Sequence, residues 1–369
     1  MTDSRYTTFN VNQSGTISDV DASRLLQKLN DDKAVLYIPV IVYMVLLMLV
    51  GIAGNLMVCL VYIKKKFKCS TDFFILNLAF LDLLTCFFGI PVEIADLRYP
   101  YTFDAPVACK LFRTVESLIS MGSTLTLIGI AVDRYKRICR LGERFSNGTA
   151  KKICAGAVIV GILTCWPAAV VFGKKSVDVG VPGIKGSDCS TDDTQRHTVY
   201  PLLYYALVFL YFLICVAVVT FIYVKISIFI RRGKNDLIKR NLNRYELNAE
   251  LTTTTEVSND SNAHAPSTSG GFKEPTMVNT IKTFRTTVIC IAITVAFIVS
   301  YLPFLVVRVT RNIKKDFEKT LSSSTEVVYK FCLKSYFIND AINPVIYSFL
   351  NAAFRQEVVR RFICKACYK

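Results

Sequence analysis

The chain carries a series of long apolar runs, and each is about as long as a lipid bilayer is thick. Roughly 20 consecutive apolar residues cross the hydrocarbon layer as a helix. Runs that approach or exceed this length lie near residues 34–63, 73–95, 111–132, 153–172, 199–230, 286–307 and 327–350. A soluble core does not require runs of this length. We therefore predict an all-α membrane protein, a bundle of seven transmembrane helices.

Helices suit these runs because a helix satisfies its own backbone hydrogen bonds in lipid, whereas an open sheet does not. The runs also lack the alternation that a lipid-facing barrel strand shows. Beyond the seventh run, apolar residues recur at helical spacing against charged residues, which predicts a short amphipathic eighth helix on the inner leaflet. Its apolar residues are Phe349, Phe354, Val358, Phe362 and Ile363.

The basic residues behind the net charge of +16 gather in short clusters beside the apolar runs, not in one domain. This distribution argues against nucleic acid as a partner. Such clusters mark cytoplasmic loops, so the N-terminus is expected outside and the C-terminus inside. The clusters lie near residues 64–68, 136–152, 231–234 and 355–365. Two interpretations stay open, interfacial anchoring to membrane lipid and contact with an acidic partner surface.

The prediction divides the chain into an extracellular tail of residues 1–33, a seven-helix domain of residues 34–350 and a cytoplasmic segment of residues 351–369. Residues 234–279 are rich in Thr, Ser and Gly, which predicts a flexible cytoplasmic loop within the domain. The tail shows no cleavable signal peptide, so the first helix is expected to direct insertion. Asn12 is the one glycosylation sequon on the predicted outer side.

Most of the 13 cysteines lie in apolar runs or at the inner face, where thiols stay reduced. Two remain at the outer face: Cys109 opens the third run, and Cys189 lies between the fourth and fifth. A disulfide between them would hold that loop over the bundle. Cys364 and Cys367 follow the amphipathic segment, where a palmitoyl chain would add a membrane contact. An unmodified thiol is the alternative at both.

Two motifs place charged or helix-breaking residues where hydrocarbon disfavours them, which usually marks function. Asp133-Arg134-Tyr135 closes the third run, and Asn343-Pro344-Val345-Ile346-Tyr347 lies inside the seventh. Arg134 follows Cys109 by 25 residues, or roughly 38 Å of helix, so one helix links both faces of the membrane. A carboxylate beside Arg134 would hold its guanidinium until a partner releases it.

These residues together resemble the rhodopsin-like, or class A, G-protein-coupled receptors, from about Ala34 to Cys367. The matching residues, in order, are Gly54-Asn55, Leu78 to Asp82, Cys109, the Asp-Arg-Tyr triplet, Pro303 and Asn343-Pro344-x-x-Tyr347. The resemblance implies a plasma-membrane receptor, not an enzyme. Its implied partners are an extracellular ligand, a heterotrimeric G protein, and also arrestin and receptor kinases.

The resemblance also assigns roles to single residues. Arg134 would meet the G protein, Tyr223 and Tyr347 would move inward on activation, and Phe297 with Pro303 would form a hinge. Tyr301 stands where the family usually has a Trp, and Thr283 where many relatives have a Glu that pairs with the triplet's arginine. The absence of that Glu predicts appreciable basal signalling.

Several polar residues lie deep in four different runs, where leaving them unpaired would be costly, so they are expected to converge. They are Asn55, Asp82, Ser123, Asn339, Asp340 and Asn343. In the family such a cluster holds a sodium ion, which here would contact Asp82, Ser123, Asn339 and Asn343. An oxygen-rich set suits a hard cation. The alternative is a hydrated network without metal, and no other cofactor is expected.

Glu116 directs the ligand prediction, because it lies seven residues, or roughly 10 Å along the helix, below Cys109. A buried carboxylate attracts a cation, and amine receptors have an Asp at the matching place. Other candidate ligand-binding residues near the outer mouth are Glu93, Arg113, Arg308 and Tyr336. Both charge signs together favour a neuropeptide over an amine. Internal pairing of Glu116 with Arg113 is the third interpretation.

Two further classes fit the sequence less well. A light sensor needs a lysine for a Schiff base, but the opsin position falls on Phe337, and Lys334 lies nearly a full turn higher. A channel or transporter needs a row of charges along a path, and no such row is evident.

Overall fold

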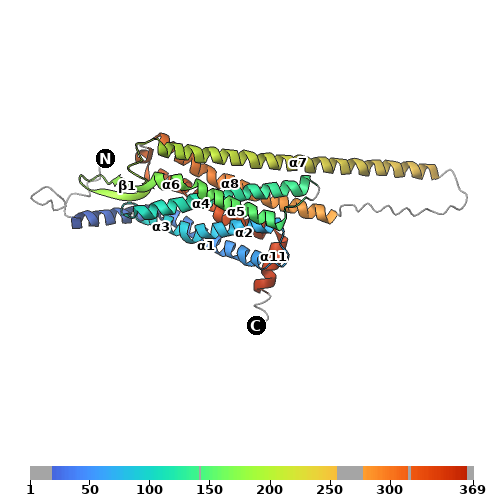
Figure 1. Ribbon diagram of the computed structural model, residues 1–369, viewed down its shortest axis with the longest axis horizontal. Helices are drawn as coiled ribbons and strands as arrows, with labels where there is room; N and C mark the ends of the chain where they lie inside the picture. The colour runs from blue at the N-terminus through green and yellow to red at the C-terminus, as the bar shows by residue number, and fades with distance from the viewer. Residues whose placement is uncertain (1–18, 141–142, 256–276, 315–316, 364–369) are drawn as a thin grey trace, which may run out of the picture.

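In a computed structural model of the chain, the structure describes residues 19–140, 143–255, 277–314 and 317–363. The predicted glycosylation site Asn12 and the predicted palmitoylation sites Cys364 and Cys367 lie outside these ranges. Most helices run side by side along one axis and form an elongated bundle (Figure 1). α1 runs along this axis from one end of the bundle to the other. The last described segment lies near the end at which α1 finishes.

The first four spans contain six helices. They are α1 (Asp19–Ile63), α2 (Ser70–Leu84), α3 (Ile90–Arg98), α4 (Pro106–Cys139), α5 (Asn147–Thr164) and α6 (Trp166–Val171). The π-helical turn η1 (Thr85–Gly89) joins α2 to α3, so these three segments make one span. Likewise α5 and α6 make one span, with Pro167 in the first turn of α6, where its missing N–H costs no helical hydrogen bond.

The remaining spans contain α7 (Tyr200–Thr255), α8 (Met277–Ile313), α9 (Ser323–Leu333) and α10 (Ile338–Leu350). A 3₁₀ turn, η3 (Ser335–Phe337), separates α9 from α10, and a second one, η2 (Phe317–Thr320), precedes α9. In the described ranges, six helical segments are long and apolar enough to cross a membrane by length and composition. The seventh span is the divided α9–η3–α10 segment, and the predicted seven-helix bundle is confirmed.

Two boundaries differ from the prediction. Residues 234–255 continue α7, whereas a loop was predicted from residue 234. These residues include no Pro or Gly, and Leu, Lys, Arg and Glu among them favour a helix. At the other end, α1 begins at Asp19, within the predicted tail. Asn30 explains part of this extension, because its Nδ2 donates to Thr102 Oγ1 at 2.9 Å and its Oδ1 accepts from Tyr101 N at 3.0 Å.

A β-hairpin that the sequence analysis did not predict covers one end of the bundle, the end predicted to be extracellular, which we call the outer end. Strand β1 (Phe172–Asp178) pairs antiparallel with β2 (Lys185–Thr191), and Lys174 lies opposite Cys189. Gly180 and Gly183 in the turn have φ of 78° and 83°, a conformation that glycine adopts readily. The predicted disulfide joins Cys189 to Cys109, with 5.6 Å between the Cα atoms. It fixes the hairpin to the start of α4.

The main apolar core fills the inner half of the bundle and draws side chains from helices far apart in the sequence. Fully buried members are Phe74 of α2, Ile226 of α7 and Tyr347 of α10. A second cluster in the outer half joins α1 to the seventh span through Met44 and Phe337. The second cluster therefore connects the first span to the seventh.

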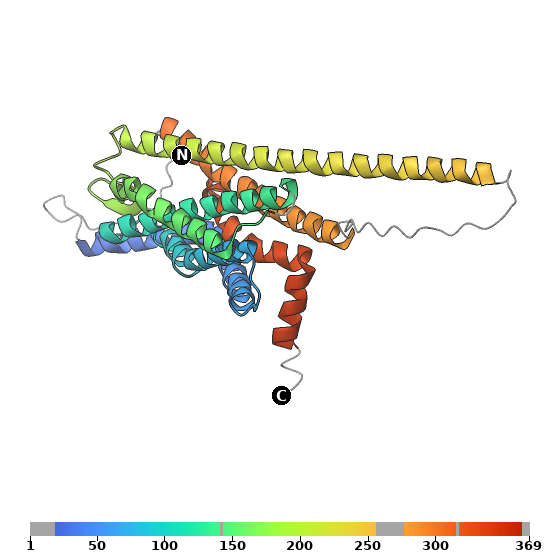
Figure 2. The ribbon, with the colours of Figure 1, turned by 45° about the vertical axis from the view of Figure 1, so that its right-hand side comes forward.

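The predicted eighth helix is present within the described residues as α11 (Ala352–Val358) with the π-helical turn η4 (Val359–Ile363). It leaves the bundle at a steep angle to the long axis, as the red segment in Figure 2 shows. Phe354 stacks on Tyr62 with 6.2 Å between ring centroids. Arg361 also donates to the Leu60 carbonyl at 3.3 Å, so α11 rests against the inner end of α1.

We expect Gly54→Ala to lower the thermal stability of the purified protein, because a Cβ at Gly54 would lie 2.6 Å from Pro344 Cβ. Overpacking of this kind costs about 1–3 kcal/mol. Gly156→Ala is the matched control, since a Cβ there meets no atom within 4 Å. Thermal unfolding in detergent, followed with a thiol-reactive dye, measures both. Equal melting temperatures for the two variants would contradict the close packing of α1 on α10.

Candidate functional site

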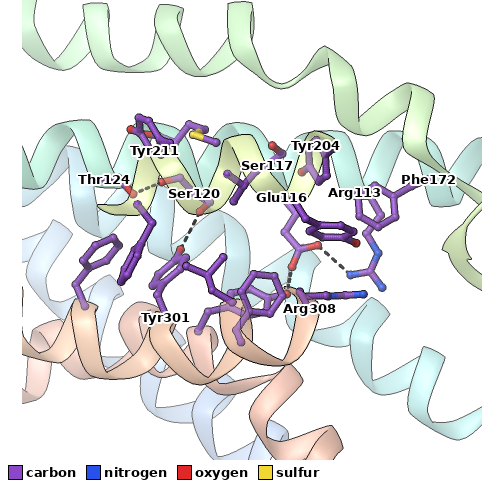
Figure 3. Close-up of a pocket in the computed structure, with 18 residues that line it drawn as sticks. Arg113, Glu116, Ser117, Ser120, Thr124, Phe172, Tyr204, Tyr211, Tyr301 and Arg308 are labelled. Atoms are coloured by element: carbon purple, nitrogen blue, oxygen red, sulfur yellow. Dashed lines mark hydrogen bonds and ion pairs between the residues drawn. The ribbon is translucent and has the colours of Figure 1, made fainter. Parts of the chain in front are cut away.

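A cavity in the outer half of the bundle, which we call the aromatic pocket, holds about 80 Å³ of free space. Its walls come from α4, α7, α8, η3 and β1, and half of its 18 lining residues are Tyr or Phe (Figure 3). Members that the argument uses are Arg113, Glu116, Ser120, Tyr301, Arg308 and Tyr336. The predicted ligand-binding residues other than Glu93 thus line one cavity.

Tyr301 lines the aromatic pocket one helical turn above Phe297 on α8. Its hydroxyl lies 2.9 Å from Ser120 Oγ, and Figure 3 shows the ring of α8 pointing toward α4. The ring packs against Phe297 with 4.6 Å between centroids. The side chain at this position, where the sequence resemblance leads one to expect a tryptophan, therefore forms a hydrogen bond with α4.

Five charged residues form a buried charge network beside this pocket. Arg113 donates to Glu116 Oε2 at 3.0 Å and also pairs with Glu93. Lys334 pairs with Glu93 from the other side, and its Nζ lies 3.9 Å from Asp96 Oδ2. Glu93 is fully buried. A buried carboxylate is tolerated in such a place only when cations and hydrogen bonds satisfy it.

The network shows which groups Glu116 contacts in the structure. Glu116 pairs with Arg113, as the third interpretation of the sequence had it, and the Tyr336 hydroxyl donates to the same carboxylate. Figure 3 shows the dashed contacts that leave Glu116 on two sides. Glu116 nevertheless lines the aromatic pocket, so an entering group can reach it.

Two members of the network, Asp96 and Lys334, were absent from the predicted ligand set. Asp96 lies three residues after Glu93, one turn along the same helix, and this spacing could have indicated it. Lys334 is buried in an apolar run, which by itself indicates a paired charge. Arg308 also lines the pocket, and its guanidinium lies 5.7 Å from the Tyr205 ring centroid.

A second, wider cavity of about 1150 Å³ lies under the hairpin at the outer face, and we call it the outer vestibule. Opposite charges cross-link its rim. Lys33 of α1 lies 2.6 Å from Glu326 of α9. Glu318 accepts from Tyr329 at 2.7 Å and lies 3.2 Å from Arg311 and 3.3 Å from Lys175.

Glu318 thereby joins the hairpin to the outer ends of α8 and α9. Burial alone would raise the pKa of the Glu318 carboxyl. The positive charges of Arg311 and Lys175 outweigh this effect and lower the pKa to about 2. The carboxylate stays ionised at physiological pH. The vestibule therefore has a rim that charge pairs hold in one arrangement.

The predicted polar cluster is assembled midway through the bundle. Asn343 Nδ2 donates to Asp82 Oδ2 at 3.0 Å, and Asn55 Nδ2 donates to the Asp340 carbonyl at 2.7 Å. Within the described chain, several buried oxygens of the cluster lack a hydrogen-bond partner: Asp82 Oδ1, Ser123 Oγ, Asn339 Oδ1 and Asn343 Oδ1. Hard oxygen donors left without partners fit a sodium ion.

Arg134 and its neighbours form a latch at the inner end of α4. Asp133 lies 2.8 Å from Arg134 and 2.9 Å from Arg137. The same carboxylate accepts from Ser70 Oγ at 2.6 Å and from Thr71 Oγ1 at 2.9 Å. Asp133 and Arg134 are both buried. The latch therefore connects α4 to the start of α2 and keeps the Arg134 guanidinium buried within the helix bundle.

The other predicted switch residues lie in or beside the main core. In the described part of the chain, the buried hydroxyls of Tyr223 and Tyr347 make no hydrogen bond. Tyr135 packs against the edge of the core. Pro303 lies inside α8 and Pro344 inside α10, and each removes one backbone donor from its helix.

We expect Glu93→Gln to destabilise the protein by about 3–5 kcal/mol, because it leaves Arg113 and Lys334 buried without their shared carboxylate. Glu143→Gln is the control, since that side chain is 58% exposed and its ion pair spans 4.0 Å. Thermal unfolding of both purified variants measures the difference. A Glu93→Gln protein as stable as the control would show that the network contributes nothing to the fold.

Comparison with known proteins finds similar chains among receptors. Neuromedin-U receptor 2 of Rattus norvegicus is 24% identical over 352 residues, covering 90% of this chain and 78% of the relative. Neuromedin-U receptor 1 of Homo sapiens is 20% identical and covers 94% and 78%. The histamine H2 receptor of Cavia porcellus is 24% identical and covers 90% and 82%.

The relatives are receptors, not enzymes, and the same holds for the family that the chain matches. Residues 54–347 match the family described as 7 transmembrane receptor (rhodopsin family). This range includes both sequence motifs, the outer disulfide, the charge network and the polar cluster. The chain therefore belongs to the rhodopsin family of seven-transmembrane receptors.

Proposed function

We propose that the chain is a plasma-membrane receptor for an extracellular peptide, a neuropeptide by likeness to its relatives, and that it activates a heterotrimeric G protein. Its N-terminus lies outside the cell and its C-terminus inside, as the basic clusters predict. The likeness to neuromedin-U receptors at 20–24% identity supports a peptide ligand. By the same family likeness, receptor kinases and arrestin follow activation, and membrane lipid surrounds the bundle.

The observation that carries the proposal is the pair of cavities in the outer half of the bundle. The vestibule of about 1150 Å³ is wide and charged, whereas the aromatic pocket is narrow. An extended peptide could cover the charged rim and place one end in the pocket, whereas a small amine would occupy the pocket alone. Ligand pockets of this kind combine apolar walls with a few polar groups that fix orientation.

We expect the ligand to bind at Glu116 and to replace one of its present partners. A cationic or hydrogen-bonding group of the ligand would compete with Arg113 and Tyr336 for its carboxylate. Arg113 keeps its pairing with Glu93 after such an exchange, so the released cation does not become unpaired. The ligand therefore changes the position of Tyr336 at a small electrostatic cost.

Tyr336 connects this exchange to the rest of the bundle. Its ring lies 5.9 Å from that of Tyr301, and Ser335 beside it donates to the Ser300 carbonyl of α8 at 2.7 Å. A shift of η3 would therefore move α8 beside the aromatic pocket. The same segment continues into Asn339 and Asn343 of the polar cluster, whose sodium ion would favour the resting packing.

At the inner face the shift would release Arg134 from the latch toward the G protein. Receptors of this kind act through two packings of the same helices, and a ligand favours the packing that it binds better. The unpaired hydroxyls of Tyr223 and Tyr347 would be satisfied by the inward movement that the family likeness implies.

An amine receptor is the second candidate. The relation to a histamine H2 receptor and the position of Glu116 in the aromatic pocket favour it. The α7 side of the pocket, however, presents Tyr204, Tyr205 and Tyr211 and no serine. A light sensor has less support, because Lys334 is ion-paired with Glu93 and does not line the aromatic pocket.

A screen of peptides and amines, read by calcium and cyclic-nucleotide reporters in transfected cells, tests the proposal. We expect a peptide to activate the receptor, and Glu116→Gln to weaken its potency roughly 10–100-fold, as loss of a charge-assisted hydrogen bond would. Asp104→Asn is the control, because Asp104 is 72% exposed at the outer face. Activation by amines alone, or equal potency on Glu116→Gln at equal expression, would overturn the proposal.

We also expect appreciable signalling without ligand. Among the described residues, Arg134 has an ion pair only with its own neighbour Asp133, and Thr283 provides no carboxylate from α8. Reporter output from cells without ligand measures this activity, and Arg134→Ala should reduce it to the level of mock-transfected cells. Output that already equals the mock control in the unmodified receptor would refute the expectation.

A further inference from the structure

Lys334 lies at the joint of the seventh span and faces two carboxylates of α3. It follows the last residue of α9 and precedes η3. Its ammonium pairs with Glu93 and lies 3.9 Å from Asp96 Oδ2. Glu93 and Asp96 are three residues apart on α3, or roughly 4.5 Å along the helix axis. The flexible four-carbon stem of a lysine can bring its ammonium to either carboxylate from one backbone position.

The two carboxylates are supplied with cations unequally. Glu93 pairs with both Arg113 and Lys334. Among the ion pairs of the described residues, Asp96 has only the longer contact with Lys334. Asp96 Oδ1 is buried and has no hydrogen-bond partner in this part of the chain. A carboxylate in such surroundings is stabilised when a cation comes closer.

The hairpin adds a second carboxyl group beside Asp96. Asp188 of β2 lies within hydrogen-bonding reach of the Asp96 carboxyl group, and it lines the outer vestibule. We call these two residues the outer acid pair. Lys175 lies opposite Asp188 in the hairpin, but its ammonium lies 3.3 Å from Glu318. Two neighbouring carboxylates repel each other, and a cation that contacts both relieves the repulsion. The outer acid pair is therefore a second place for the Lys334 ammonium.

We propose that Lys334 is a positioning residue whose ammonium moves from Glu93 to the outer acid pair when the receptor is activated. This inference rests on the proposed function, in which a cationic ligand group replaces Arg113 at Glu116. Arg113 then pairs with Glu93 alone, so Glu93 stays neutralised without Lys334. The exchange leaves no carboxylate of the network without a cation, which keeps its electrostatic cost low.

The exchange acts on the joint at which Lys334 lies. The next residue, Ser335, donates to the Ser300 carbonyl of α8 at 2.7 Å. A movement of the Lys334 side chain toward the outer acid pair would pull on η3 and, through Ser335, on α8. The loss of one ion pair at Glu116 thereby reaches the sixth and seventh spans together.

Glu116→Gln tests the exchange without a ligand, because it removes the carboxylate that Arg113 shares its charge with. Reductive dimethylation of the purified full-length receptor, read by mass spectrometry, reports the exposure of each lysine. Lys334 is buried beside Glu93, whereas the outer acid pair lies at the wall of the vestibule. We expect Glu116→Gln to raise the labelling rate of Lys334 about fivefold or more. Lys330, which already lines the vestibule, is the internal reference.

A second substitution identifies the new partner of Lys334. Adding Asp96→Asn to Glu116→Gln should return the labelling rate of Lys334 to that of the parent, whereas Asp96→Glu should preserve the rise because it keeps the carboxylate. Asp188→Asn should also reduce the rise, and it supplies the test if Asp96→Asn fails to fold. Melting temperatures verify folding. An unchanged rate in Glu116→Gln, or a rise that survives the loss of these carboxylates, would overturn the proposal.

Asp178→Asn is the matched control in the Glu116→Gln background. Asp178 lines the same vestibule, and its carboxylate accepts from the Gly180 N–H at 2.9 Å, which an asparagine side chain can also do. This variant should keep the full rise in Lys334 labelling. Loss of the rise in the control would show that any change of charge in the vestibule suffices, and would contradict a specific partner for Lys334.

Reporter output without ligand separates this inference from the proposed function. Glu116→Gln should raise basal signalling about fivefold, and Asp96→Asn should remove the rise. The expected labelling changes, with signalling at the mock-transfected level in every variant, would support the exchange and refute activation of a G protein. Unchanged labelling of Lys334 beside normal signalling would overturn the exchange and leave the proposed function in place.

Discussion

Hydrocarbon offers no partner for a polar side chain, so each polar group that these helices carry inward depends on another helix. Glu93 shows the constraint most clearly, because this fully buried carboxylate on α3 pairs with Arg113 of α4 and with Lys334 at the end of α9. Asp82 with Asn343 repeats the arrangement midway, and the latch repeats it at the inner end. The helices are thus held in register by polar contacts at three depths, in addition to their apolar packing.

The spans and the two sequence motifs were predictable because each depends on residues close in the sequence. A run of apolar residues indicates a helix in lipid whatever it packs against, so the bundle was evident before the structure. The placement of Arg134 and Asn343 within such runs indicated function for the same reason. The disulfide followed from topology, since Cys109 and Cys189 alone were predicted at the outer face.

The rest depends on contacts between distant residues. Lys334 meets a carboxylate 241 residues away, and no local pattern identifies that partner. The hairpin has short polar strands that are held in place by the disulfide and by the backbone of Ser187. The Ser187 N–H donates to the Tyr101 carbonyl, and the Ser187 carbonyl accepts from the Phe103 N–H. The inner extension of α7 was mistaken for a loop because its polar composition was weighed above its lack of Pro and Gly. Polar composition alone does not exclude a helix where the residues favour one.

The turn at Lys334 also has a mechanical meaning. An unbroken helix transmits a tilt along its whole length, whereas α9 and α10 are two short rods that meet at η3. The outer rod is fastened to the rim through Glu326, and the inner rod packs on α1 at Gly54. The two rods can therefore change their relative angle at η3, and a movement of η3 would reach α8 through the hydrogen bond from Ser335 to the Ser300 carbonyl.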